Sequence, residues 1–311
     1  MTRRRVIIAA VGFGLCLLVP LVVQQDYQLN VLFRIALGAA LGLSWNLVGG
    51  YAGQLSLGHA AFFGIGAYSL PLFHDKVGLP LAVALVLGIA VAVTAASVIG
   101  KVAFRLRGPY FALATIAFAE VLRLSAKNLD NLTGGDVGLQ VPGLFGPTAP
   151  IRWFYVSAVL LTAAAFTATA LIARSRFGYQ LQAVREDEDT ARACGIDAAR
   201  VKLQAFMISA AFTALGGALY MSQIASVVPD SAFAIDLSER PAIDAMLGGA
   251  GTLTGPIVGA ILIETAQELF KNVFREAFQL IYGVLLVLVV LFLPDGIVGT
   301  LAARWRRKRA P

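Results

Sequence analysis

The sequence predicts an all-α bundle of transmembrane helices, with about eight spans and one broken, re-entrant segment. Hydrophobic residues make up 58% of the chain, charged residues only 14%, and the mean hydropathy is +0.78. A soluble domain carries about 25% charged residues. The apolar residues also form runs without any charge, at Leu81–Ile99, Val156–Ala173 and Leu280–Leu293. Because about 20 apolar residues match a bilayer core, we expect residues 1–311 to form one multi-pass membrane domain.

Positive charge gathers near the two ends of the chain. Arg3, Arg4 and Arg5 precede the first apolar run, and five basic residues lie between positions 304 and 309. Lysine and arginine accumulate in the cytoplasmic segments of membrane proteins, so both termini are expected in the cytoplasm. This placement accounts for the net charge of +7 better than a nucleic-acid surface does, and no nucleic-acid partner is expected.

If the chain crosses the membrane eight times, starting in the cytoplasm, the basic segments all fall on the cytoplasmic side. Segments 101–107 and 174–202 then fall in the cytoplasm, and the loop 127–151, which is poor in basic residues, falls outside. The expected spans are about 6–23, 29–48, 54–73, 80–100, 109–126, 152–173, 203–226 and 278–298.

A further apolar segment, 242–270, does not fit as a ninth crossing, because it would place the basic tail outside. Its centre, Leu247–Pro256, contains four glycines and a proline. Glycine lowers helix stability, and the residue before a proline disfavours the helical conformation. We therefore expect a half helix that enters from outside, breaks at the glycines and returns. Unwound backbone at membrane depth must be surrounded by protein or line a water-filled cavity.

A similar glycine-rich string occurs early in the chain, at Gly49–His59. With one gap it aligns with 247–256 as a weak internal repeat. Paired interrupted segments are typical of a transport site near the bilayer midplane, whereas glycines and polar residues also serve close helix packing and buried hydrogen bonds. Both interpretations stay open. The candidate pathway residues at the two interruptions are Gly53, Gln54, Ser56, His59, Gly249, Gly251 and Thr252.

Motifs for catalysis and metal binding are missing from the sequence. There is no GxxxxGK[ST] loop, so the chain is not expected to hydrolyse ATP itself. The two histidines, His59 and His74, are too few for a metal cluster, and no cysteine or carboxylate group has ligand spacing. We expect neither an enzyme nor a bound cofactor or metal.

The polar segment 174–202 predicts a short helix outside the membrane, suited to docking another protein. Carboxylates at 186–189 favour a helix N-terminus, and Gly195 favours a left-handed helix end. Asp197 is a suitable cap for the next span. The alternative for such a segment is a solvated loop.

The stretch Gly53–Tyr68, GQLSLGHAAFFGIGAY, resembles the signature of branched-chain amino acid ABC transporter permeases. Three further stretches agree, at Arg107–Glu120, Leu132–Leu139 and Phe177–Leu203, and Gly248–Gly259 matches as well. The RGPY and TGG motifs at 107–110 and 133–135 are similar to the LivM-type subunit rather than to its LivH-type partner. The resemblance covers nearly the whole chain.

The resemblance implies a permease subunit of an ABC importer that translocates branched-chain or related amino acids across a bacterial inner membrane. Its partners would be a homologous LivH-type permease, two cytoplasmic ATPase subunits that bind and hydrolyse ATP, and a periplasmic solute-binding protein. The coupling motif of such permeases would fall on 189–191, where Asp and Thr replace the usual Glu and Ala. The residues expected to couple to the ATPase are Arg185, Glu186, Asp187, Asp189, Ala191, Ala193 and Gly195.

The sequence leaves two other functions open. An ion-coupled secondary transporter needs intramembrane acidic residues, which are scarce here. An intramembrane enzyme would have to use His59.

Overall fold

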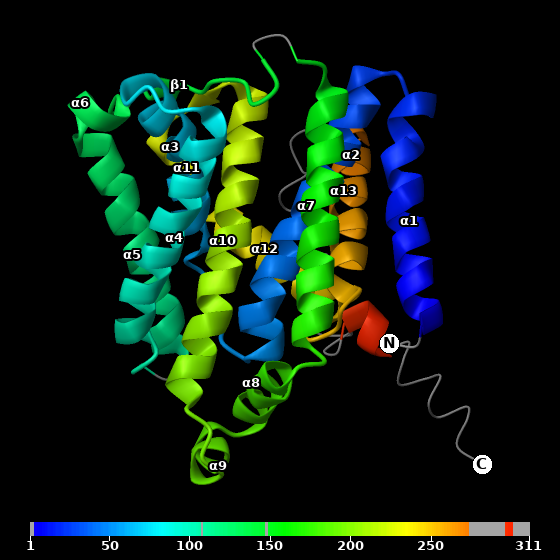
Figure 1. Ribbon diagram of the computed structural model, residues 1–311, viewed down its shortest axis with the longest axis vertical. Helices are drawn as coiled ribbons and strands as arrows, with labels where there is room; N and C mark the ends of the chain where they lie inside the picture. Colours follow the sequence, from blue (N-terminus) through cyan, green and yellow to red (C-terminus); the bar gives the residue numbers. More distant parts are fainter. Residues whose placement is uncertain (1–2, 107, 147–148, 274–295, 301–311) are drawn as a thin grey trace.

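The computed structural model describes residues 3–106, 108–146, 149–273 and 296–300. These residues form a helical bundle whose long helices run side by side (Figure 1). The long helices are α1 (Arg3–Val22), α2 (Asp26–Asn46), α4 (Leu81–Ala103), α5 (Pro109–Asn128), α7 (Ile151–Ile172), α10 (Ala198–Ile224) and α13 (Gly255–Val273).

Shorter elements connect or interrupt the long helices. They are the π-helical turns η1 (Leu47–Tyr51) and η2 (Pro71–Lys76), and α3 (His59–Leu70), α6 (Asp130–Thr133), α8 (Arg176–Glu186), α9 (Glu188–Ala193), α11 (Pro229–Ala232) and α12 (Asp236–Gly249). Two short strands, β1 (Leu139–Gln140) and β2 (Ser226–Val227), pair antiparallel. The start of α1 lies at the end of the bundle that carries α8 and α9, whereas α6 and β1 lie at the other end (Figure 1).

Within the described residues, five helical segments are long and apolar enough to cross a membrane: 26–51, 81–103, 109–128, 151–172 and 198–224. They correspond to five of the expected spans. Helix α1 covers nearly all of the expected first span, 6–23, and is apolar from Val6 onward. The expected span 278–298 lies mostly outside the described residues, so the total of eight stays a prediction.

The expected span 54–73 differs from the structure. Residues 53–58 are not helical, and α3 begins only at His59. Gly53 adopts a left-handed φ of +67°, which glycine alone adopts without strain, and this conformation ends the helical path after η1. The glycine-rich string is therefore a break within the bundle, between α2 and α3.

Small residues decide how α4 packs. Its buried positions recur about every four residues and are all alanine or glycine, at Ala84, Gly88, Ala92, Ala96, Gly100 and Ala103. This stripe contacts α3 and α10, where small side chains let helix backbones approach closely. Valines such as Val86 and Val98 point outward and are more than 60% exposed. Helix α4 thus presents one packing face and one face suited to lipid.

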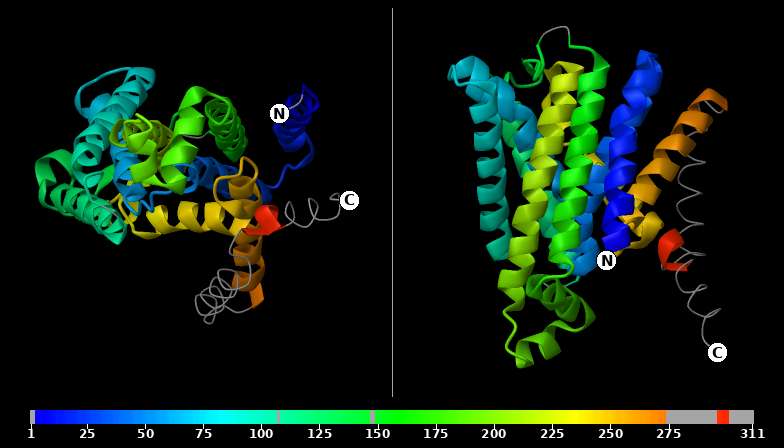
Figure 2. Two further views of the ribbon diagram at one scale, coloured as in Figure 1. Left: turned by 90° about the horizontal axis from the view of Figure 1, so that it is seen from below. Right: turned by 45° about the vertical axis from the view of Figure 1, so that its right-hand side comes forward.

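The helix break expected within 242–270 is confirmed, and the entry of this segment from outside the membrane stays a prediction. Helix α12 ends at Gly249 and α13 begins at Gly255, with no helix between them. The pairs Arg240–Glu264, Asp244–Gly259 and Gly248–Gly255 approach in reverse order, so α12 and α13 form an antiparallel hairpin. Seen from below in Figure 2, α12 lies lengthwise across the view, oblique to the long helices. The hairpin packs against α2, the helix at the centre of the bundle.

Candidate coupling and translocation site

The segment 174–202 forms two helices, α8 and α9, which project from one end of the bundle (Figure 1). Side-chain caps define each helix start. The Ser175 hydroxyl accepts from the Gly178 amide at 3.2 Å, and the Asp187 carboxylate accepts from the Thr190 amide at 2.5 Å. This bond holds the pKa of the exposed Asp187 carboxyl below its ordinary value. Each cap satisfies an amide that the helix leaves free.

The predicted roles of Gly195 and Asp197 are confirmed, whereas the predicted start of the docking helix needs a correction. Gly195 has a left-handed φ of +84°, and Asp197 caps α10 through the Arg200 amide at 3.0 Å, both as predicted. The helix predicted around 186–194 is α9, which begins only at Glu188. Glu186 instead ends α8, because Asp187 is extended (φ −157°, ψ 114°) and separates the two helices.

An ion pair fixes α9 to the bundle. The Glu188 carboxylate accepts from Lys202 of α10 at 2.9 Å and from Arg192 at 2.5 Å. Lys202 is 2% exposed, and its ammonium lies over the ring of Phe104. A charge this deeply buried needs such partners. Sequence reasoning missed Glu188 and Lys202, although Lys202 directly precedes an expected span.

The predicted coupling residues fall into two groups. Ala191 is buried within the segment and packs in a small cluster with Val184 and Ala198, so its surface is not free to contact a partner. The others are exposed: Arg185, Glu186, Asp187, Asp189, Ala193 and Gly195. Their contact with an ATPase subunit stays a prediction.

Arg185 connects α8 to the first glycine break. Its guanidinium Nη1 donates to the carbonyl of Gly50 at 2.7 Å. The backbone of Gly53 packs so closely on Arg185 that an added Cβ would lie 2.9 Å from its Cγ. A Cβ at Gly251 would collide with the guanidinium itself. One side chain of α8 therefore touches both glycine strings.

The two predicted interruptions meet inside the bundle. The Asn46 side chain accepts from the Gly251 amide at 2.8 Å and donates to the Thr252 carbonyl at 2.9 Å. Gly50 and Gly251 are so close that a Cβ on Gly50 would collide with the Gly251 amide. Asn46 is fully buried, and its amide satisfies backbone that no helix pairs. Sequence reasoning missed Asn46; a polar residue inside an expected span was the available signal.

Thr252 and Gly249 complete the second break. The Thr252 hydroxyl donates to the Gly249 carbonyl at 2.7 Å and accepts from the Gly255 amide at 3.1 Å, which caps α13. Gly249 and Gly251 have φ of 126° and 77°, values that side-chain-bearing residues rarely adopt.

His59 and Ser56 belong to a buried hydrogen-bond network. His59 contacts Ser56 at 3.2 Å through Nδ1 and Ser209 at 2.8 Å through Nε2, and all three residues have no exposed surface. Ser209 in turn bonds Ser44 of α2. In this conformation Ser56 and His59 join helices and face no open path, as the packing interpretation expects. Gln54 is half-buried beside them.

Comparison with known proteins agrees with these features. The family profile "Branched-chain amino acid transport system / permease component" matches residues 27–290. The chain is 32% identical over 285 residues to the high-affinity branched-chain amino acid transport permease LivM of Salmonella typhimurium and to that of Escherichia coli, which covers 83% of this chain and 67% of each relative. It is 26% identical over 303 residues to LivH of Escherichia coli, covering 89% and 97%.

No solved structure matches the chain. The family profile spans most of the bundle, including both glycine breaks and the α8–α9 segment. The identity to LivM exceeds the identity to LivH, in line with the motifs at 107–110 and 133–135. The chain therefore belongs to the family of branched-chain amino acid transport permease components.

Proposed function

We propose that this chain is the LivM-type permease subunit of an ATP-driven importer that moves branched-chain amino acids across a bacterial inner membrane. The relatives named above are branched-chain amino acid transport permeases. A LivH-type permease, two cytoplasmic ATPase subunits and a periplasmic solute-binding protein complete the proposed assembly. In this arrangement both termini lie in the cytoplasm, and the start of α1 at the end that carries α8 and α9 supports this for the N-terminal side.

The observation that carries the proposal is the contact of Arg185 with both glycine breaks. Helices α8 and α9 project from the bundle and expose acidic and small residues, so they are placed to receive a partner. Arg185 reaches inward from the same unit to the carbonyl of Gly50 and packs against Gly251. A displacement of α8 therefore acts directly on the unwound backbone.

The proposed mechanism is alternating access. ATP binding closes the ATPase pair, and this closure moves the α8–α9 unit. Arg185 transmits the movement to the paired breaks, where backbone without helical bonds changes conformation at low cost. The bundle then opens toward the docked binding protein and receives the solute. ATP is bound and hydrolysed by the partner subunits, and this chain performs no catalytic step.

Uptake of L-leucine into proteoliposomes tests the proposal. The assembled complex is reconstituted with ATP in the lumen and leucine-loaded binding protein outside. We expect uptake that requires both ATP and the binding protein, that vanadate blocks, and that ionophores leave unchanged. Uptake that continues without ATP and collapses with a proton or sodium gradient would show an ion-coupled transporter instead.

A further inference from the structure

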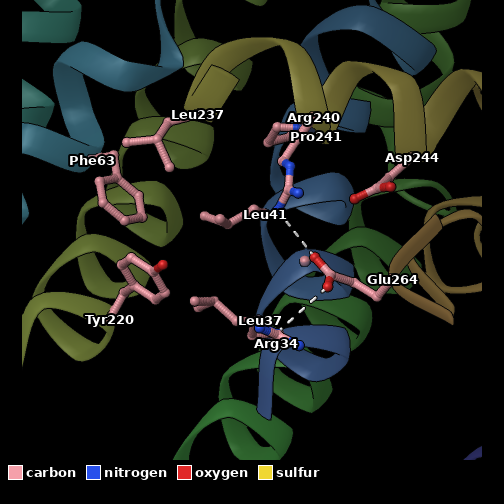
Figure 3. A pocket seen from close by; sticks show the side chains of 11 residues that line it. Arg34, Leu37, Leu41, Phe63, Tyr220, Leu237, Arg240, Pro241, Asp244 and Glu264 are labelled. Atoms are coloured by element: carbon pink, nitrogen blue, oxygen red, sulfur yellow. Dashed lines mark hydrogen bonds and ion pairs between the residues drawn. The ribbon is translucent and has the colours of Figure 1, made fainter. Parts of the chain in front are cut away.

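A cavity lies between α2, α10 and the α12–α13 hairpin, and its walls differ in chemistry (Figure 3). One wall is apolar and is formed by Phe63, Tyr220 and Leu237. The facing wall carries charged side chains, with Leu37 and Leu41 of α2 between the two. A site with an apolar surface and a few convergent polar groups is typical of small-molecule binding.

The charged wall carries both acidic and basic side chains. Glu264 lies between two arginines, 3.2 Å from Nη1 of Arg240 and 3.7 Å from Nε of Arg34. Arg240 also donates to Gln267. Arg240 is the more exposed arginine, with 42% of its side chain accessible, against 28% for Arg34. Its guanidinium is therefore the cation that a solute in the cavity can reach.

Asp244 is the acidic group that the protein leaves unsatisfied. It is 4% exposed, and its Oδ1 has no hydrogen-bond partner within the described part of the chain. Gly38 and Gly42 of α2 admit its side chain, since a Cβ on Gly38 would lie 3.5 Å from Oδ2 and one on Gly42 3.4 Å from the Asp244 Cβ. Figure 3 shows the carboxyl directed toward the cavity. A buried polar oxygen without a donor destabilises the folded protein, and a cationic donor removes that cost.

The position of the cavity relative to the glycine breaks also fits a binding site that a solute occupies during transport. On α2 it extends from Arg34 to Leu41, and Arg34 precedes Asn46 by 12 residues, about 18 Å along the helix. Asn46 holds the paired breaks, which lie toward α8 and α9. Between cavity and breaks, Gly42 contacts Pro256 so tightly that a Cβ on the glycine would lie 3.2 Å away. The cavity therefore lies on the side of the breaks opposite to α8 and α9.

We propose that this cavity is a transient site for the zwitterion of a large aliphatic amino acid on its way through the permease. Asp244 receives the ammonium group, Arg240 receives the carboxylate, and the aliphatic side chain packs against Phe63, Tyr220 and Leu237. The inference rests on the proposed import function and names a place for the solute within it. Only a ligand that carries both a positive and a negative charge pairs with Asp244 and Arg240 at the same time.

Transport kinetics with charge-removing variants provide the first test. The variants Asp244→Asn and Arg240→Gln keep the size of the side chains and remove the charge. Their controls, Asp230→Asn and Arg123→Gln, break an exposed ion pair elsewhere in the chain. With saturating leucine-loaded binding protein, we expect the cavity variants to lower leucine uptake at least tenfold, while ATP hydrolysis stimulated by the binding protein continues. The controls should transport like the wild type.

Direct binding provides the second test and does not depend on the charge variants. Saturation-transfer NMR of the wild-type complex without binding protein should show transfer to L-leucine. Excess L-valine should displace the signal, whereas leucinamide and 4-methylpentanoate, which each lack one charge, should not. Leu237→Trp, which fills the apolar side of the cavity, should abolish it.

Two results overturn the inference. One is wild-type uptake in both cavity variants, and the other is a leucine signal that is absent or equally displaced by the singly charged analogues. Loss of ATP-dependent uptake in the wild type would instead refute the proposed function, so the two failures are distinguishable.

Discussion

Asn46 shows how much one side chain contributes at the centre of this bundle. Its amide pairs with the Gly251 amide and the Thr252 carbonyl, two backbone groups that a continuous helix would have satisfied. Each such group left unpaired in a buried place costs about 1–3 kcal/mol. The break is therefore tolerated because the Asn46 side chain pairs with both backbone groups. Glycine supplies the backbone conformation that brings these groups to Asn46.

The glycines at the breaks should not accept a side chain. Gly251→Ala places a Cβ at a φ of 77°, which costs about 1–2 kcal/mol, and also forces the Arg185 guanidinium away. We expect a lower midpoint of thermal unfolding and reduced uptake. Gly12→Ala is the matched control, because Gly12 is exposed with no atom within 4 Å of an added Cβ. Equal unfolding midpoints for the two variants would mean that Gly251 has no special role.

At the scale of elements, the α8–α9 unit has an inner and an outer surface. Ala191 is turned inward against Val184 and Ala198, whereas Ala193 is exposed. The Glu188–Lys202 pair and the Asp187 cap hold the unit in place. The α8–α9 unit therefore presents a preformed surface to the proposed ATPase partner.

Substitution of each of these two alanines by tryptophan distinguishes an effect on docking from an effect on folding. Ala193→Trp adds bulk on the exposed side, so we expect the ATPase subunits to co-purify at least tenfold less while the permease keeps its thermal stability. Ala191→Trp adds the same bulk inside the unit and should lower the stability of the permease itself. Unchanged ATPase retention with Ala193→Trp would exclude this surface from docking.

Local signals in the sequence predicted several of these elements. Gly195 and Asp197 take the conformation and the capping role expected of their residue types, and the helix break falls where Leu247–Pro256 predicts it. The breaks meet through Asn46, a contact across 205 residues that no local pattern encodes. The charged cavity was missed for the same reason, because Arg240 and Asp244 of α12 form one wall with Glu264 of α13 only when α12 folds back on α13.

The whole molecule has two distinct ends, and this polarity defines a topology. Helix α6 with Asn131 lies at one end, and α8 and α9 with Asp187 lie at the other (Figure 1). Basic residues concentrate in 174–202, which favours a cytoplasmic location for that end.

Cysteine labelling tests this topology. In a background with Cys16 and Cys194 replaced by serine, Asn131→Cys should react with an impermeant maleimide from the periplasmic side. Asp187→Cys should react only after the membrane is opened. Reaction of both cysteines from the same side would contradict an arrangement in which these two segments lie on opposite sides of the membrane.

In the proposed mechanism, Arg185 transmits movement of the α8–α9 unit to the paired breaks. The most direct measurement is the number of leucine molecules taken up per ATP hydrolysed by the reconstituted Arg185→Met complex. Arg176→Met, an exposed position on the first turn of α8, is the control. Because Arg185→Met removes the bond to the Gly50 carbonyl, we predict ATP hydrolysis near the wild-type rate with uptake at least tenfold lower, a coupling loss of about 1.4 kcal/mol or more. A wild-type ratio of uptake to hydrolysis in Arg185→Met would mean that Arg185 does not transmit this movement.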